Sequence, residues 1–172
     1  MKKTLLVNLY AGPCAGKSTI CAGIFYELKK RGVDCEMALE FAKEKVWDEC
    51  TTILDDQVYV FGKQYHKVNR LNGKVDVIIT DSPLPLSIHY NKESSENFDN
   101  LVIEKFNKFN HIDYFINRGS NYNENGRVHS LAQSIQIDNE LKTLLAKYDI
   151  PYIEVDQSNA IEIIVNDIIK TL

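Results

Sequence analysis

The stretch LYAGPCAGKSTI, residues 9–20, decides the fold. An apolar run ends here, and small residues, a proline and a cysteine separate it from Gly-Lys-Ser-Thr. This spacing is that of a phosphate-binding loop (P-loop), whose pattern is Gly, any four residues, then Gly-Lys-Ser or Gly-Lys-Thr. Gly16, Lys17 and Ser18 fit the pattern, whereas Ala11 stands at the first glycine position. Alanine there costs backbone freedom, because only glycine visits positive φ freely.

The surroundings of the loop support the match. Thr4–Tyr10 is an apolar run typical of a buried parallel strand, and Lys17–Arg31 has helical spacing that ends at Gly32. A loop between a strand and a helix N-terminus presents N–H groups that favour an anion. We therefore predict that phosphates contact the loop and the first helical turn: Gly12, Pro13, Cys14, Ala15, Gly16, Lys17, Ser18 and Thr19. The alternative is a glycine-rich turn that binds no nucleotide.

Outward from the loop, strand-like and helix-like segments alternate. Strands are expected at Thr4–Tyr10 and, further along, at 33–39, 75–80, 112–117 and 151–156. Helices are expected at 17–31, 41–50, 55–71, 96–109, 130–148 and 158–171, with a loop after Asp81 that holds two prolines. This alternation predicts an α/β fold, one domain over residues 1–172, with helices on both faces of a parallel sheet. Ligands of such sheets bind at the carboxyl ends of the strands.

The composition is that of an ordinary globular protein. The 172 residues include 44% hydrophobic and 26% charged residues, with a net charge of −4. No basic run favours duplex DNA binding, and no apolar run approaches the roughly 18 residues of a membrane span. The start of the chain shows no signal peptide. Four cysteines without paired spacing indicate a reducing, cytoplasmic environment and not a metal site or disulfide frame.

A magnesium site is predicted from two side chains. Ser18 closes the P-loop pattern, and Asp81 follows the apolar run VDVIIT, where P-loop proteins place an acidic residue for Mg²⁺. The alternative for Asp81 is a turn-forming residue before Ser82-Pro83. Lys17 is expected to reach the β- and γ-phosphates of a bound nucleotide.

A polar stretch, INRGSNYNENGRVHS, is predicted to be a mobile lid at about residues 118–128. Arg118 and Arg127 are candidates to neutralise the transferred phosphoryl group, and the alternative is two solvated arginines. A GTP switch is disfavoured, because Asn91-Lys92-Glu93-Ser94 lacks the final Asp of the guanine-reading motif. A small-molecule kinase fits better, since it needs a lid and an acceptor site.

The acceptor side is predicted from residues after the second strand. Glu40 could take the proton of an acceptor hydroxyl, or it could be an acid at a helix start. Gln57 and Gln64, seven residues apart, present amides suited to a base edge. Trp47 could stack on a base, but a core position is favoured for it.

The placed residues resemble the P-loop kinase superfamily of nucleoside and nucleotide kinases. The chain is most similar to small phage-type AAA-like ATP-binding proteins, which are related to the ribosylnicotinamide-kinase domain of NAD-salvage regulators. The resemblance covers nearly the whole chain and lies in YAGPCAGKST, EFAKEKVW, DDQVYVFGKQ, VDVIITDSPLPLS and NRGSNYNENGRVHSLAQSIQIDNEL. It implies a three-layer fold with a five-stranded parallel sheet in the order 2-3-1-4-5, with ATP and Mg²⁺ as cofactors. Asp81-Ser82-Pro83 lacks the arginine of the deoxynucleoside kinase motif, and this departure leaves the acceptor open.

The expected activity is ATP- and Mg²⁺-dependent phosphoryl transfer. A nucleoside, a nucleotide and a modified base such as 5-hydroxymethyluracil in phage DNA are all possible acceptors, and a phage-encoded chain would act in the host cytoplasm. The carried-over residues are Lys17, Ser18, Asp81, Arg118 and Arg127, with Glu40 and Gln64 on the acceptor side. The alternative is a nucleotide- or phosphoinositide-binding regulator with little turnover.

Overall fold

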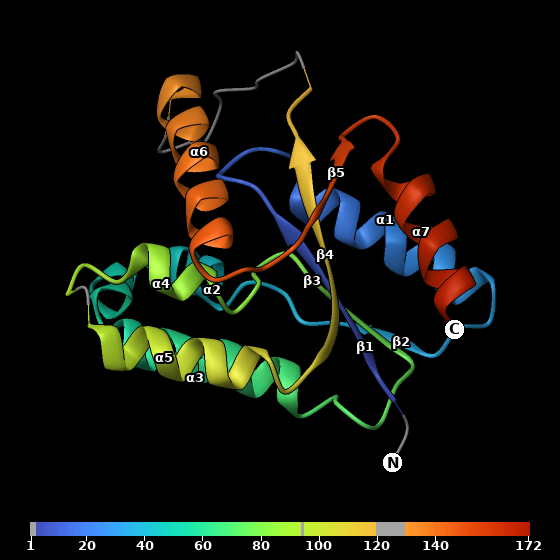
Figure 1. The fold of residues 1–172 in the computed structure, drawn as a ribbon, viewed down its shortest axis with the longest axis horizontal. Helices are drawn as coiled ribbons and strands as arrows, with labels where there is room; N and C mark the ends of the chain where they lie inside the picture. Colours follow the sequence, from blue (N-terminus) through green and yellow to red (C-terminus); the bar gives the residue numbers. More distant parts are fainter. Residues whose placement is uncertain (1–2, 94, 120–129) are drawn as a thin grey trace.

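The fold is built on a five-stranded sheet (Figure 1). The structure is a computed structural model that describes residues 3–93, 95–119 and 130–172. The strand order is β2-β3-β1-β4-β5, and all neighbours are parallel. The strands are β1 Leu5–Tyr10, β2 Cys35–Met37, β3 Val77–Thr80, β4 Asn110–Asn117 and β5 Ile153–Asp156. The predicted fold class and strand order are confirmed.

The strand register brings the expected site residues to one edge of the sheet. β1 lies at the centre, where Asn8 is opposite Thr80 of β3 and Asp113 of β4. In a parallel sheet the carboxyl ends of all strands point the same way, so the segments that follow β1, β2 and β3 meet. These segments are the P-loop, Glu40 and Asp81.

Helices cover both faces of the sheet (Figure 1). One face carries α1 Lys17–Lys30 and α7 Ala160–Thr171. On the other side lie α2 Phe41–Trp47, α3 Gln57–Asn69, α4 Leu86–Tyr90, α5 Glu96–Phe106 and α6 Leu131–Lys147, with a 3₁₀ helix at Thr51–Asp55. Since parallel strands are joined by crossovers through helices, this arrangement buries β1 and β3 on both faces, whereas three of the four residues of the edge strand β5 are exposed.

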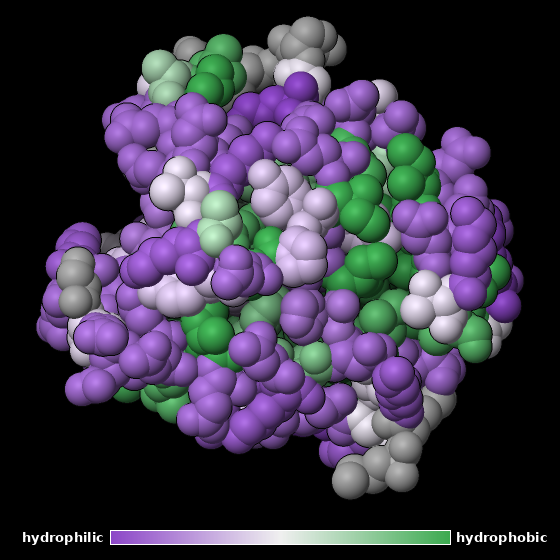
Figure 2. Space-filling model, in the orientation of Figure 1, coloured by the Kyte–Doolittle hydropathy of each residue, from purple (hydrophilic) through white to green (hydrophobic). Residues whose placement is uncertain are grey.

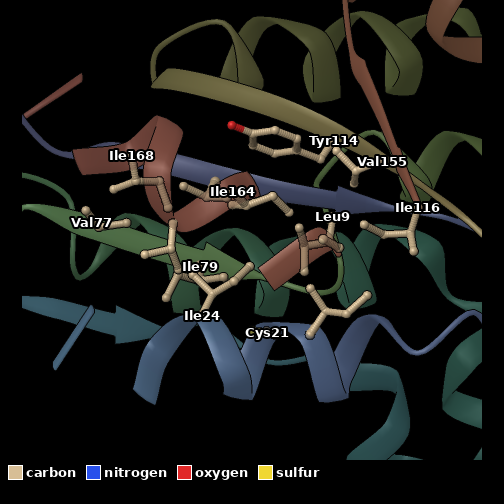
Figure 3. Packing of buried hydrophobic residues seen from close by; sticks show 14 of the residues in the cluster. Leu9, Cys21, Ile24, Val77, Ile79, Tyr114, Ile116, Val155, Ile164 and Ile168 are labelled. Atoms are coloured by element: carbon tan, nitrogen blue, oxygen red, sulfur yellow. The ribbon is translucent and has the colours of Figure 1, made fainter. Parts of the chain in front are cut away.

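Two hydrophobic clusters separate the three layers. Figure 3 shows the first, in which Ile24 of α1 and Ile164 of α7 pack over Ile79 and Leu9 of the sheet. The second cluster lies on the opposite face and includes Leu6, Tyr10, Ile78, Phe106 and Leu141. Alternate β1 residues enter the two clusters, as the period of two in a strand requires. The central strand is therefore buried on both faces, which fixes the position of the loop at its end.

Several elements have other bounds than the sequence predicts; α2 and α5, for example, end three residues earlier, at Trp47 and Phe106. β2 covers only Cys35–Met37, shorter than the predicted 33–39. The expected helix over 55–71 is shorter: α3 covers Gln57–Asn69, and Asp56 at its N-cap accepts a hydrogen bond from Tyr59 N–H. α4, Leu86–Tyr90, lies within the stretch expected to be a loop.

Hydrophilic residues cover most of the face seen in Figure 2. No helix in the part of the chain that the structure describes is long and apolar enough to cross a membrane.

Candidate functional site

The P-loop backbone explains why alanine is accepted at its first position. Gly16 has φ 81°, and Cys14 has φ 68°, so the left-handed residues lie late in the loop. Among the described residues, the other non-glycine positions with positive φ are Glu49 and Asp149, so Ala11 needs no left-handed conformation. Its side chain is buried. The departure from the pattern therefore costs no backbone strain.

At Gly12, and not at residue 11, the loop lies too close to α6 for a side chain. A Cβ there would lie 2.8 Å from the carbonyl oxygen of Ser134 and 2.9 Å from Nη2 of Arg118. It would also lie 3.1 Å from Cγ2 of Ile137. Glycine at position 12 lets the loop pack against α6.

Lys17 is the first residue of α1, and its ammonium turns back toward the loop. Nζ donates to the carbonyl oxygens of Ala11 at 2.7 Å and Gly12 at 3.0 Å. Desolvation lowers the pKa of Lys17, while the carboxylates of Glu40 and Asp81 oppose this shift. A cation held in poorly solvated surroundings is suited to bind phosphate oxygens.

The structure brings together Ser18 and Asp81, the two predicted magnesium ligands. The Ser18 hydroxyl donates to Oδ2 of Asp81 at 2.6 Å, and Oδ1 of Asp81 accepts from the N–H of Glu40 at 3.1 Å. Asp81 is buried and follows β3. The end of β3 is thereby tied to the P-loop and to the start of α2.

A cavity of about 240 Å³ opens beside this pair. Residues of α1, of β2, of α2 and of the segment between β2 and α2 line it together with Asp81: Ser18, Ala22, Met37, Leu39, Glu40, Lys43, Glu44 and Trp47. Glu40 precedes α2, and its side chain makes no capping hydrogen bond. Desolvation raises the pKa of Glu40, and the nearby Lys17 opposes that rise.

Trp47 lies in the cavity wall and not in the core. The core position favoured from the sequence is wrong, because 80% of Trp47 is exposed. Trp47 ends α2, a helix of seven residues in which only Phe41 is buried. An exposed indole beside a cavity offers a flat apolar surface to a ring.

Tyr90, which the sequence analysis did not select, lies close to the carboxylate of Glu40. Desolvation raises the pKa of Tyr90 to about 12, and the negative charge of Glu40 adds to the rise. Tyr90 ends α4, is 44% exposed, and contacts the ring of His89 edge-on. The sequence signal for Tyr90 is an aromatic residue after Pro85. It lies in a stretch that the sequence predicts to be a loop, so Tyr90 was not selected.

The two glutamines predicted to read a base lie elsewhere. Gln64 is 3% exposed, and its Oε1 accepts from Phe41 N–H at 3.0 Å. Its Nε2 donates to Ala38 O at 3.3 Å. The amide therefore holds the β2–α2 turn, which corrects the base-reading role. Gln57 donates to Leu54 O at the start of α3, and neither glutamine lines the cavity.

Arg118 is bound at the base of the site. Its guanidinium donates to both carboxylate oxygens of Asp138 and to the carbonyl of Pro13. Arg118, the candidate to neutralise the transferred phosphoryl group, is thus hydrogen-bonded within the protein and is not a solvated arginine. Arg127 and almost all of the predicted lid at 118–128 lie outside the described residues.

The oxygens of Ser18 and Asp81 fit a Mg²⁺ site. The two side chains lie within hydrogen-bonding distance of each other beside the P-loop. Mg²⁺ in nucleotide sites takes one or two protein oxygens and completes its shell with phosphates and water. Within residues 3–93, 95–119 and 130–172, no group of three or more His, Cys, Asp or Glu could hold a metal ion.

Known structures share this fold. A structure of the NadR protein in complex with NR matches with a TM-score of 0.67 and 18% identity. The match covers 90% of this chain and 45% of that one, so the chain spans about half the length of this relative. A structure of APE1195 matches over 100% of this chain and 98% of its own, with a TM-score of 0.51 and 16% identity. At these identities the similarity shows the fold alone.

The sequence itself matches a family. No curated protein matches the chain significantly. A family model described as an AAA domain matches residues 6–162, which include the P-loop, Glu40, Asp81 and Arg118. The match covers far more than half of the chain and confirms the predicted relation to AAA-like P-loop proteins. The chain therefore belongs to this AAA domain family.

Proposed function

We propose that the protein transfers the γ-phosphoryl group of ATP to a hydroxyl group of a small acceptor. The observation that carries this proposal is the meeting of three groups beside the P-loop. Ser18 and Asp81 lie together where we propose that Mg²⁺ binds, and Glu40 lines the adjacent cavity with both of them. A phosphate-binding loop, a metal position and a carboxylate beside a cavity are the parts that phosphoryl transfer requires.

Each group of residues has its own role in this phosphoryl transfer. The P-loop amides and Lys17 bind the donor phosphates, and Ser18 and Asp81 hold Mg²⁺, which neutralises charge on the phosphate oxygens when it is bound. Glu40 accepts the acceptor's hydroxyl proton while the hydroxyl oxygen bonds to the γ-phosphorus and ADP leaves. The raised pKa of Glu40 makes it a better proton acceptor than an ordinary glutamate, provided that it is ionised.

The cavity favours an acceptor that has a ring and no phosphate. Three of its residues are acids, Glu40, Glu44 and Asp81, and Lys43 is the basic one. No arginine from the described part of the chain lines it. Carboxylates repel a phosphorylated acceptor, whereas Trp47 offers a surface for stacking. Among the acceptor classes expected from the sequence, a nucleoside or similar ring-bearing hydroxyl compound fits this cavity best. The NadR relative, which was solved in complex with NR, supports a small-molecule ligand for this fold.

The proposal is tested by measuring γ-phosphate transfer from labelled ATP to a panel of nucleosides, nucleoside monophosphates and modified DNA. We expect labelling of a hydroxyl compound without phosphate, and strong loss of labelling with Glu40→Gln while ATP still binds. Labelling of monophosphates alone would contradict the acceptor class. Absence of transfer to every compound, with ATP binding intact, would favour a regulator over a kinase.

A further inference from the structure

Asp138, a residue of α6, binds the P-loop directly. Its Oδ1 accepts a hydrogen bond from the N–H of Gly12 at 2.6 Å. The same carboxylate accepts from Arg118, with Oδ2 bonded to Nε and Oδ1 bonded to Nη2 at 3.1 Å. One carboxylate thus joins the loop to the residue that follows β4.

Arg118 holds the next peptide group of the loop. Its Nη1 donates to the carbonyl oxygen of Pro13, and its Nη2 also donates to the carbonyl oxygen of Ser134 at 3.2 Å. The side chains of Arg118 and Asp138 are only 11% and 14% exposed. Charge-assisted hydrogen bonds are strong in such poorly solvated surroundings. The pair therefore fixes two consecutive positions of the loop, Gly12 and Pro13.

The loop needs such support because of its backbone conformation. The Pro13 carbonyl belongs to the peptide that leads into Cys14, whose φ is 68°. A left-handed conformation is unfavourable for a residue other than glycine and persists only where the surroundings enforce it. The hydrogen bond from Arg118 holds the peptide on the N-terminal side of this strained residue.

The pair also balances charge near Lys17. Desolvation has the largest effect and lowers the pKa of Lys17. The charge of Arg118 also lowers this pKa, whereas the charge of Asp138 raises it. The two side chains therefore act on Lys17 in opposite directions. Neutralising one of them alone would leave the charge of the other uncompensated beside the phosphate-binding lysine.

We propose that Asp138, acting through Gly12 and Arg118, is a positioning residue that holds the P-loop in the conformation that binds phosphates. It touches no reacting atom, and its carboxylate is used entirely within the protein. The inference rests on the proposed function, because it assumes that the loop binds a nucleotide. The inference adds to the proposed function a residue that controls nucleotide affinity. This residue lies on α6, on the face of the sheet opposite to α1.

The test compares ATP binding by the wild type, Asp138→Asn and Arg118→Lys. Asparagine keeps an oxygen for Gly12 N–H but loses the charge that binds Arg118, and lysine keeps the charge but loses the two parallel donors. We expect ATP binding to weaken by about 10-fold or more in Asp138→Asn, as for loss of a charge-assisted hydrogen bond, and by less in Arg118→Lys. The KM for the acceptor should stay unchanged, and the phosphorus NMR shifts of bound ATP should move.

Lys142→Gln is the matched control. Lys142 lies one turn after Asp138 on α6 and pairs with Glu154, away from the loop. Its loss should leave ATP binding unchanged. All proteins are measured at a temperature where thermal unfolding shows them folded, and Arg118→Lys carries the test if Asp138→Asn does not fold. If the folded variants bind ATP as tightly as the wild type, the positioning role is overturned and the proposed function stands. A wild type that binds no ATP would overturn both.

Discussion

Replacing Gly12 by alanine tests how the loop packs on α6. The new Cβ would lie 2.8 Å from Ser134 O and 2.9 Å from Arg118 Nη2, closer than the 3.4–4 Å of ordinary contact. The Ser134 oxygen belongs to the α6 backbone and cannot turn aside, so the loop must move by several tenths of an ångström. That movement stretches the hydrogen bond between Gly12 N–H and Asp138, now 2.6 Å.

The size of the effect follows from these contacts. Overpacking costs about 1–3 kcal/mol, and the reduced freedom of the unfolded chain offsets about 0.4–1 kcal/mol of that. The net loss of about 1–2 kcal/mol lowers Tm by roughly 2–8 °C for a chain of this length. Displacement of the loop also weakens ATP binding, by about 10-fold for the equivalent of one charge-assisted hydrogen bond.

Thermal unfolding and calorimetric titration with Mg²⁺-ATP measure the two effects. Gly62→Ala is the matched control, because a Cβ at this α3 position meets nothing within 4 Å. Alanine there should raise stability by up to about 1 kcal/mol through helix propensity and leave ATP binding unchanged. A Gly12→Ala protein with the wild-type Tm and ATP affinity would refute the reasoning.

Three further substitutions separate the roles within the site. Asp81→Asn keeps an acceptor for the Glu40 N–H but loses charge, so the Mg²⁺ needed for half-maximal activity should rise without a large change in Tm; a large loss of Tm alone would make Asp81 structural. Wild-type kcat should rise with pH as Glu40 ionises, with a midpoint above that of an ordinary glutamate because desolvation raises its pKa. Glu40→Gln should lower kcat by about 10²–10⁴-fold and abolish that rise, and an unchanged pH profile would exclude Glu40 as the base. Trp47→Ala should raise the acceptor KM by about 5- to 100-fold, as for loss of one stacked ring, with the ATP KM unchanged; equal KM values would place the acceptor elsewhere.

Local sequence signals were sufficient to locate the P-loop and to predict a parallel sheet, whereas the strand order followed from the family resemblance. Lys17 and Ser18 lie in a motif whose residue spacing indicates the conformation of the loop. The apolar run of β1 is long enough to be recognised as a buried strand. Asp81 could be placed because it directly follows such a run. Parallel strands then bring these segments to one edge of the sheet without further information.

The missed features depend on contacts between distant segments. Asp138 looks like an ordinary polar residue of a helix, and only the packing of α6 on Gly12 reveals its contact with the loop. α4 has five residues, too few to show a helical period, so the position of Tyr90 at a helix end could not be predicted from the sequence. The amide of Gln64 reads equally well as a binding group or a structural one, and its burial in the structure favours the second.

Calorimetric titration of Mg²⁺-ATP into the wild type and Lys17→Ala tests the central claim most directly. The wild type should bind one equivalent of ATP. The variant should bind about 10- to 150-fold more weakly, because it lacks the charge-assisted contact of the ammonium with the phosphates. Equal affinities of the two proteins, or no binding by the wild type, would contradict the assignment of residues 11–18 as a nucleotide-binding loop.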